Sequence, residues 1–174
     1  KNIITNCYAS RINSNPVVMI GNYEGEVIRS MIDTVLIPIM MIRNRSYFAE
    51  YSSQSSFSNS KPDIVVAMEA SVEEFELDIK LLQESKHWNY MAVYIVLEGA
   101  GSDCGIALET LRTAWRMDIS KAIYVCLDTR VNQTLMFTLN PLTNFAPKPW
   151  EAVTNAREFN VSGDWTLFRQ QFEE

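Results

Sequence analysis

One stretch of the sequence, residues 90–128, constrains the fold more than any other, because it holds an apolar run, a glycine-rich turn, an amphipathic segment and a second apolar run. The first run, MAVYIVL at 91–97, is β-branched, aromatic and uncharged, which favours a strand covered on both faces. The second run, AIYVCL at 122–127, has the same character. Strand, helix and strand with short connections form a right-handed parallel crossover. The stretch therefore predicts an α/β domain.

The segment between the two runs is expected to be an amphipathic helix that begins near Cys104. Its apolar side chains recur every three or four residues, which is the spacing of one helix face. The predicted inner face holds Cys104, Leu108, Leu111 and Trp115, and the predicted outer face holds Glu109, Arg112, Thr113 and Arg116.

Similar patterns recur on both sides of this unit. A serine that can cap a helix at Ser71, with a glutamate three residues later at Glu74, predicts a helix start, and Glu76 can pair with Lys80 one turn apart. The serine-rich residues 44–61 show no sustained period and are expected to form a long loop. Strands are predicted at 16–21, 37–42, 62–68 and 134–139, and further helices at 24–36, 72–83 and, short, at 165–173.

Length, composition and net charge limit the class of protein. A chain of 174 residues, 47% apolar, is about the size of one domain and can bury a core without metal or disulfide bonds. We expect a single domain over 1–174, with its core at 16–141 and an irregular tail at 142–174. The net charge of −6 and the scattered Lys and Arg argue against a nucleic-acid partner. The chain begins without an initiator methionine or a signal peptide, as expected of a mature or excised segment.

Three cysteines, Cys7, Cys104 and Cys126, lack the spacing of a metal or redox motif, and no metal site is expected. In the predicted topology, Cys104 opens a helix after one strand and Cys126 lies near the carboxyl end of the next, so both belong to one edge of the sheet. A disulfide between them would add about 3 kcal/mol of stability. The alternative is two small buried thiols. Cys7 is left over in either case.

The turn at Gly99 and Gly101 follows a strand and opens a helix, as a dinucleotide-binding turn does, with Asp128 placed near the end of the next strand. Cys104 stands where the third glycine is needed, and Asp103 puts a negative charge beside the phosphate position. A plain tight turn is therefore the preferred interpretation. No catalytic or cofactor-binding residue is predicted.

A cysteine nucleophile at Cys104 would need a base, and the single histidine, His87, is expected at the opposite edge of the sheet. Three sites match the glycan acceptor pattern N-x-S/T and fall in or beside predicted loops. A secreted location is favoured by these sites, Asn44, Asn132 and Asn160.

The order of several segments resembles a known family. The succession PDIVVAM at 62–68, the acidic helix at 72–83 and WNYMAVYIVL at 88–97 is similar to the amino-terminal extracellular region of divergent insect ionotropic receptors, chemosensory relatives of ionotropic glutamate receptors. The similarity spans about 16–141. It continues through LETLRTAW at 108–115, ISKAIYVCL at 119–127 and LMFTLNP at 135–141.

This resemblance implies a three-layer α/β/α domain with a mainly parallel sheet, similar to one lobe of a periplasmic-binding-protein fold. It also implies a non-catalytic part of a ligand-gated cation channel at the extracellular face of the plasma membrane, with the tail leading to a ligand-binding domain and the membrane reached only through the rest of the protein. The implied partners are other receptor subunits or a co-receptor, or a small molecule. The alternative is a cytoplasmic nucleotide-binding enzyme that uses the turn at Gly99 and Gly101.

Overall fold

The structure is a computed structural model, and it describes residues 15–23, 39–42, 61–99, 104–130, 132–142, 145, 148–153 and 165–171. This part of the chain forms an α/β fold with an eight-stranded mixed sheet and two helices. The elements are β1 (Val17–Gly21), β2 (Ile39–Ile42), β3 (Ile64–Glu69), α4 (Val72–Gln83), β4 (Val93–Glu98), α5 (Ala107–Arg116), β5 (Ala122–Asp128), β6 (Gln133–Asn140), β7 (Glu151–Ala152) and β8 (Thr166–Gln171).

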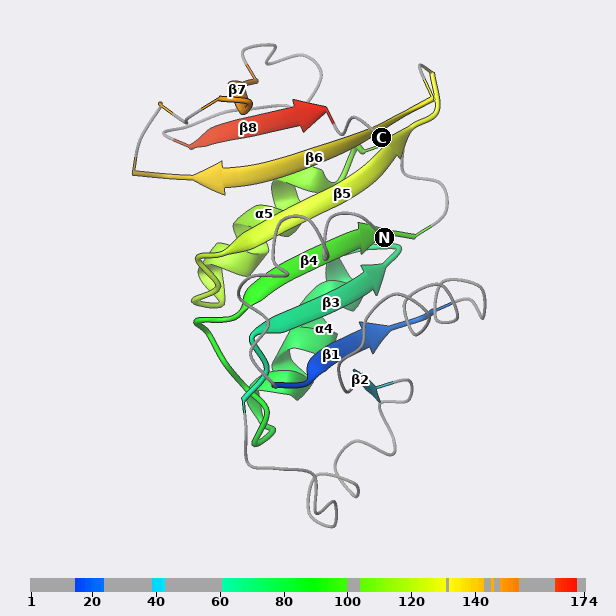
Figure 1. Ribbon diagram of the computed structural model, residues 1–174, viewed down its shortest axis with the longest axis vertical. Helices are drawn as coiled ribbons and strands as arrows, with labels where there is room; N and C mark the ends of the chain where they lie inside the picture. Colours follow the sequence, from blue (N-terminus) through cyan, green and yellow to red (C-terminus); the bar gives the residue numbers. More distant parts are fainter. Residues whose placement is uncertain are drawn as a thin grey trace.

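The strands follow one another across the sheet in the order β2-β1-β3-β4-β5-β6-β8-β7 (Figure 1). The first five pair in parallel, as the apolar runs predicted, and the last three are antiparallel additions at one end. β2 is added on one side of β1, and β3 and the strands after it are added on the other side, so the strand order reverses between β1 and β3. Open α/β sheets bind ligands at the carboxyl edge beside such a reversal.

Both described helices lie on the same face of the sheet, behind it in the view of Figure 1. The reason is that β3-α4-β4 and β4-α5-β5 are right-handed crossovers that advance in the same direction. Their apolar stripes meet Tyr94 and Tyr124 in one buried cluster that includes Phe75 and Leu111. A second buried cluster, around Met19, lies on the opposite face. The predicted helix at 24–36 lies outside the described residues.

The start of α4 confirms the capping prediction. The Ser71 hydroxyl accepts a hydrogen bond from the Glu74 amide at 3.2 Å, and the Glu74 carboxylate accepts one from the Ala70 amide. Lys80 pairs with Glu76 at 2.6 Å on the exposed face. The bonds of Ser71 and Glu74 supply acceptors for backbone amides that have no hydrogen-bond partner within the first turn of the helix.

The predicted faces of α5 are wrong in two places. Thr113 is buried although it was assigned to the outer face, and Trp115 is only partly buried, with its ring edge against Trp165 at a centroid separation of 6.1 Å. Small side chains at 107, 110, 113 and 114 let the helix pack closely against the sheet, so the buried stripe is wider than the large residues indicate. The helix begins at Ala107, after a turn over 104–106.

The prediction of an irregular tail ending in a short helix is also wrong. Residues that were expected to be helical form β8, which pairs antiparallel to β6 and buries Leu167 and Phe168. β7 then pairs with β8 at the edge. Pairing with the open edge of β6 outweighs the weak helical spacing of this segment, and the sheet extends well beyond residue 141.

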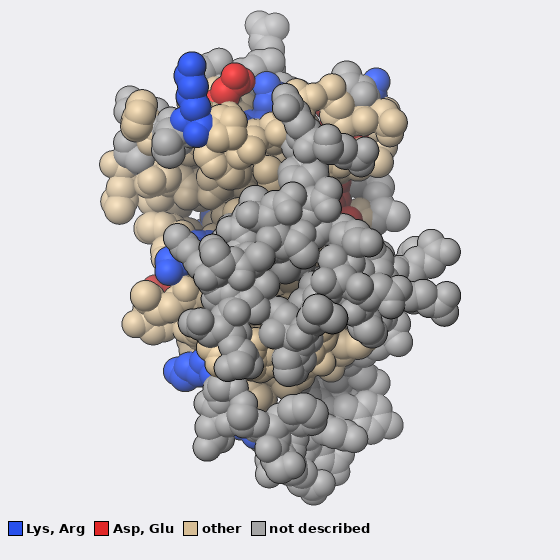
Figure 2. All heavy atoms as spheres, in the orientation of Figure 1, with Lys and Arg blue, Asp and Glu red and all other residues tan. Residues whose placement is uncertain are grey.

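Two features of the described surface bear on partners. On the face that Figure 2 shows, the Lys and Arg side chains of the described residues are scattered and form no continuous basic patch. No helix within the described ranges is long and apolar enough to cross a bilayer.

Candidate functional site

The carboxyl ends of the parallel strands form the candidate site, because this edge of the sheet contains the strand-order reversal. Acidic side chains stand at three of these ends: Glu69 on β3, Glu98 on β4 and Asp128 on β5. Glu69 and Glu98 are register partners in neighbouring strands. Glu69 and Asp128 are buried, and Glu98 is partly buried.

The reversal between β1 and β3 is tightly packed. Gly21 adopts φ of +110°, and a Cβ atom there would lie 2.3 Å from the Met68 carbonyl oxygen, so only glycine fits. The Tyr23 hydroxyl shares its proton between the carbonyl oxygens of Ile20, at 2.6 Å, and Val66. Burial, and then the nearby Glu69 carboxylate, raise the pKa of Tyr23 far above its usual range. The chain at this reversal is therefore closely packed around Gly21 and the buried Tyr23 hydroxyl.

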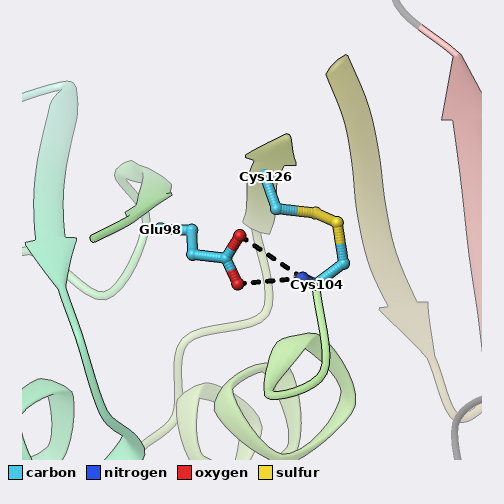
Figure 3. A group of neighbouring side chains, drawn as sticks. All are labelled: Glu98, Cys104 and Cys126. Carbon is cyan, nitrogen blue, oxygen red and sulfur yellow. Dashed lines mark hydrogen bonds between the residues drawn. A yellow bond between two sulfur atoms is a disulfide. The ribbon is translucent and has the colours of Figure 1, made fainter. Parts of the chain in front are cut away.

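The turn between β4 and α5 is held by Glu98 and a disulfide (Figure 3). The Cys104 amide donates to both carboxylate oxygens of Glu98, at 3.0 and 3.3 Å, and the Tyr124 hydroxyl donates to one of them at 3.0 Å. Cys104 is joined to Cys126 on β5, with their Cα atoms 5.4 Å apart. Of the two alternatives left open by the sequence, the structure contains the disulfide and not two separate thiols.

The same three residues place ligand atoms within 4.8 Å of one another, as a metal site would. Metals bind cysteine as thiolate, and both sulfurs are consumed in the disulfide. The Glu98 carboxylate is in turn engaged by Cys104 and Tyr124. In the oxidised chain the cluster of Glu98, Cys104 and Cys126 is therefore a structural cross-link.

The geometry of the turn disfavours a dinucleotide site. A phosphate needs free backbone amides at the helix start, but the Gly99 amide donates to the Glu69 carbonyl at 2.7 Å and the Cys104 amide donates to Glu98. A carboxylate already lies where the phosphate would bind. Gly101 lies outside the described residues.

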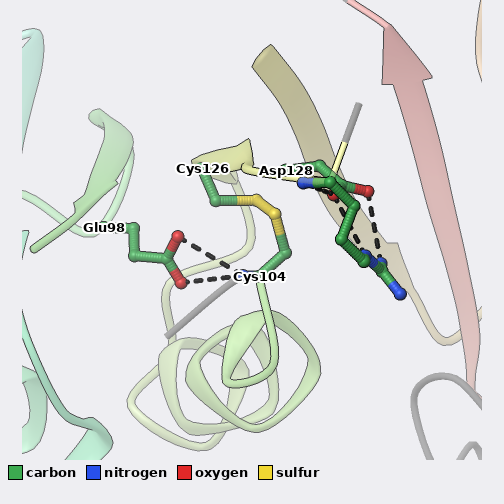
Figure 4. Close-up of polar contacts among 5 residues, drawn as sticks. Glu98, Cys104, Cys126 and Asp128 are labelled. Carbon is green, nitrogen blue, oxygen red and sulfur yellow. Dashed lines mark hydrogen bonds and ion pairs between the residues drawn. A yellow bond between two sulfur atoms is a disulfide. The ribbon is translucent and has the colours of Figure 1, made fainter. Parts of the chain in front are cut away.

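Asp128, the residue in position to hold a ribose, forms an ion pair with Arg130 (Figure 4). Both carboxylate oxygens take part, at 3.2 Å from Nε and 3.2 Å from Nη2 of the guanidinium, and the Arg130 amide donates to the same group at 3.0 Å. This bidentate arrangement fixes the carboxylate at the end of β5.

His87 is buried, with 3% of its surface exposed, in the connection between α4 and β4. That connection lies at the amino edge of the parallel strands, whereas Cys104 lies at the carboxyl edge. The two residues cannot form a catalytic pair. Burial, and the charge of the neighbouring Lys86, lower the pKa of His87.

Of the three predicted glycan sites, the structure describes Asn132. Its side chain is exposed in the tight turn between β5 and β6, at φ of +52°, where asparagine is one of the few residues tolerated. Asn44 and Asn160 lie outside the described residues, as does Cys7.

One feature was missed from the sequence. A polar cleft of about 430 Å³ lies beside Asp128, at the antiparallel end of the sheet. The cleft depends on β8, whose residues were expected to be helical, so no local pattern in the sequence could have shown it.

No protein-family model matches the chain, and no curated protein or solved structure matches it either.

Proposed function

We propose that the chain is a non-catalytic extracellular domain of a ligand-gated cation channel of the insect chemosensory ionotropic receptor type. Its task in this proposal is subunit assembly or contact with an external ligand or partner. The three-layer arrangement and the likeness to one lobe of a periplasmic-binding-protein fold are parts of the same proposal.

The observation that carries the proposal is the disulfide between Cys104 and Cys126. Disulfides persist in oxidising compartments and are rare in the cytosol. This one joins the turn before α5 to β5, at the edge of the sheet where α/β enzymes place their ligands. An extracellular location follows more naturally from such a bond than a cytoplasmic one, and the exposed Asn132 is compatible with a glycan there.

The engagement of the polar groups at this edge supports a non-catalytic role. General acids, bases and nucleophiles act through groups that can reach a substrate. Here Glu98 accepts from Cys104 and Tyr124, and Asp128 is paired with Arg130. Among the described residues these contacts stabilise the fold and leave the carboxylates little freedom for proton transfer.

The test uses a receptor that contains this chain, expressed in insect cells with its co-receptor. Deleting residues 1–174 is expected to abolish co-precipitation of the two subunits and to reduce the receptor labelled at the cell surface. The double substitution Cys104→Ser/Cys126→Ser is expected to reduce surface labelling, whereas the matched control Cys7→Ser is not. Normal assembly and normal responses after the deletion would contradict the proposal.

A separate measurement tests the nucleotide alternative. The isolated chain is mixed with NAD or ATP and its melting temperature is followed, because a ligand that binds the native state raises that temperature. No rise is expected. A rise that grows with nucleotide concentration would favour the enzyme.

A further inference from the structure

The cleft at the antiparallel end of the sheet is lined by residues of four strands, β5, β6, β7 and β8, and by Pro149, two residues before β7. Register places Asp128 opposite Gln133, Leu135 opposite Gln171 and Arg169 opposite Glu151. Directly opposed residues of antiparallel strands project from the same face. The described lining consists of Asp128, Gln133, Leu135, Pro149, Glu151, Arg169, Gln170 and Gln171.

These opposed pairs lie on the face of the sheet that α4 and α5 cover. Leu135 and its register partner Cys126 both belong to the core cluster beneath the helices. Figure 1 shows α5 running behind β5, while β8 and β7 extend beyond it. The cleft therefore begins where the helical layer ends, next to the disulfide, since its lining residue Leu135 is the register partner of Cys126.

The volume of about 430 Å³ is suited to a small molecule, since ligand pockets run from about 300 to 1,000 Å³. The lining is rich in planar hydrogen-bonding groups: three amides, two carboxylates and one guanidinium. Leu135 and Pro149 supply its apolar part. A lining of this kind does not suit an apolar ligand, whose binding would leave those polar groups without water.

The charges around the cleft balance. Asp128 is neutralised by its bidentate pair with Arg130. Glu151 and Arg169 face each other across β7 and β8, and no ion pair or hydrogen bond of the Arg169 side chain occurs within the part of the chain that the structure describes. The guanidinium can only donate hydrogen bonds and the carboxylate can only accept them.

A hydroxyl group accepts and donates at once, so it can bridge Arg169 to Glu151 where a carboxylate or an ammonium group can satisfy only one of them. The glutamine amides also pair well with hydroxyls in both directions. We propose that this cleft binds a small, uncharged polyhydroxylated compound of the size of a sugar or a cyclic polyol. The site is separate from any role in channel assembly and stands if that role fails.

The test is saturation-transfer NMR on the 174-residue chain with a mixture of D-glucose, sucrose and myo-inositol. Glycine, acetate and hexanol serve as the zwitterionic, anionic and apolar comparison probes. Transfer is expected to at least one of the three polyols and to none of the comparison probes. Transfer to no polyol, or equal transfer to glycine or acetate, overturns the proposal.

Two variants locate the binding. Glu151→Ala changes an exposed side chain on a two-residue strand, and Arg169→Met removes the donors while keeping most of the side-chain length. Each is expected to weaken polyol binding by about 10-fold, the effect of losing a hydrogen bond to a charged group. The matched control Arg116→Met removes an exposed arginine from α5 and is expected to bind as the wild type does. Unchanged binding in both cleft variants overturns the proposed site.

Discussion

The backbone amide of Cys104 donates to the carboxylate of Glu98, with nitrogen to oxygen distances of 3.0 and 3.3 Å. Glu98 ends β4, and Cys104 begins the turn that leads into α5. Cys104 itself adopts a positive φ of +66°, in the left-handed region of the backbone. A side chain thus takes the place that an anionic ligand occupies at comparable turns.

Neutralising this acid is expected to loosen the turn. In Glu98→Gln, the amide group keeps one acceptor oxygen for Cys104 or Tyr124 but loses the charge that strengthens both bonds. We expect a loss of about 1 to 2 kcal/mol in the free energy of unfolding, measured by urea denaturation. The matched control is Glu84→Gln, an exposed acid at the end of α4, which is expected to change stability little. Equal stability of Glu98→Gln and the wild type would show that the carboxylate is dispensable.

Removal of the disulfide is expected to have a larger effect. Cys104 and Cys126 are 22 residues apart in sequence, and closing a loop of that length restricts the unfolded chain. The substitution Cys104→Ser/Cys126→Ser is expected to lower the free energy of unfolding by about 3 kcal/mol. Reducing the wild type with dithiothreitol should give the same loss. The control Cys7→Ser leaves this bond intact. An equal loss in its free energy of unfolding would contradict the prediction.

Gly21 is expected to tolerate no side chain. In Gly21→Ala the new Cβ would lie 2.3 Å from the Met68 carbonyl oxygen, at a backbone φ of +110°. Backbone atoms cannot move aside cheaply, so a loss of at least about 2 kcal/mol is expected in urea denaturation. Gly99→Ala is the comparison variant. A Cβ atom at Gly99 would lie 3.2 Å from the Glu69 carbonyl oxygen, and the backbone there is not in the left-handed region, so the loss in the free energy of unfolding should be smaller. The reverse ranking would contradict the packing described at the strand-order reversal.

His87 is expected to make stability depend on pH. Burial lowers the pKa of the folded imidazole below its usual 6.5, so the unfolded chain takes up a proton first as the pH falls. The stability that His87 contributes is therefore present above about pH 6.5 and is lost as the pH falls toward the folded pKa. Urea denaturation at about pH 7.5 and about pH 5.5 should show a smaller decrease for His87→Gln than for the wild type. An identical decrease in both proteins would exclude His87 as its source.

The parallel part of the fold could be predicted because local pattern and tertiary environment agree there. The centres of the two apolar runs, residues 94–96 and 124–126, are buried in neighbouring central strands. The capping contacts of Ser71 and Glu74 depend on residues only three or four apart. Topology alone put Cys104 and Cys126 at one edge of the sheet.

The antiparallel end could not be predicted in the same way. Thr166 to Gln171 has apolar spacing compatible with a short helix, and its strand form depends on pairing with β6, about thirty residues earlier in the chain. The cleft follows from that pairing, because Arg169 meets Glu151 only when both β7 and β8 are in place. Thr113 was misassigned for a related reason: a small polar residue carries no signal of burial until the helix packs against the sheet.

The most direct test of an extracellular, disulfide-fastened domain is a non-reducing peptide map of the chain secreted from insect cells. Mass spectrometry is expected to find the peptides containing Cys104 and Cys126 joined to each other. Secreted, folded protein in which both cysteines are free thiols would contradict the account.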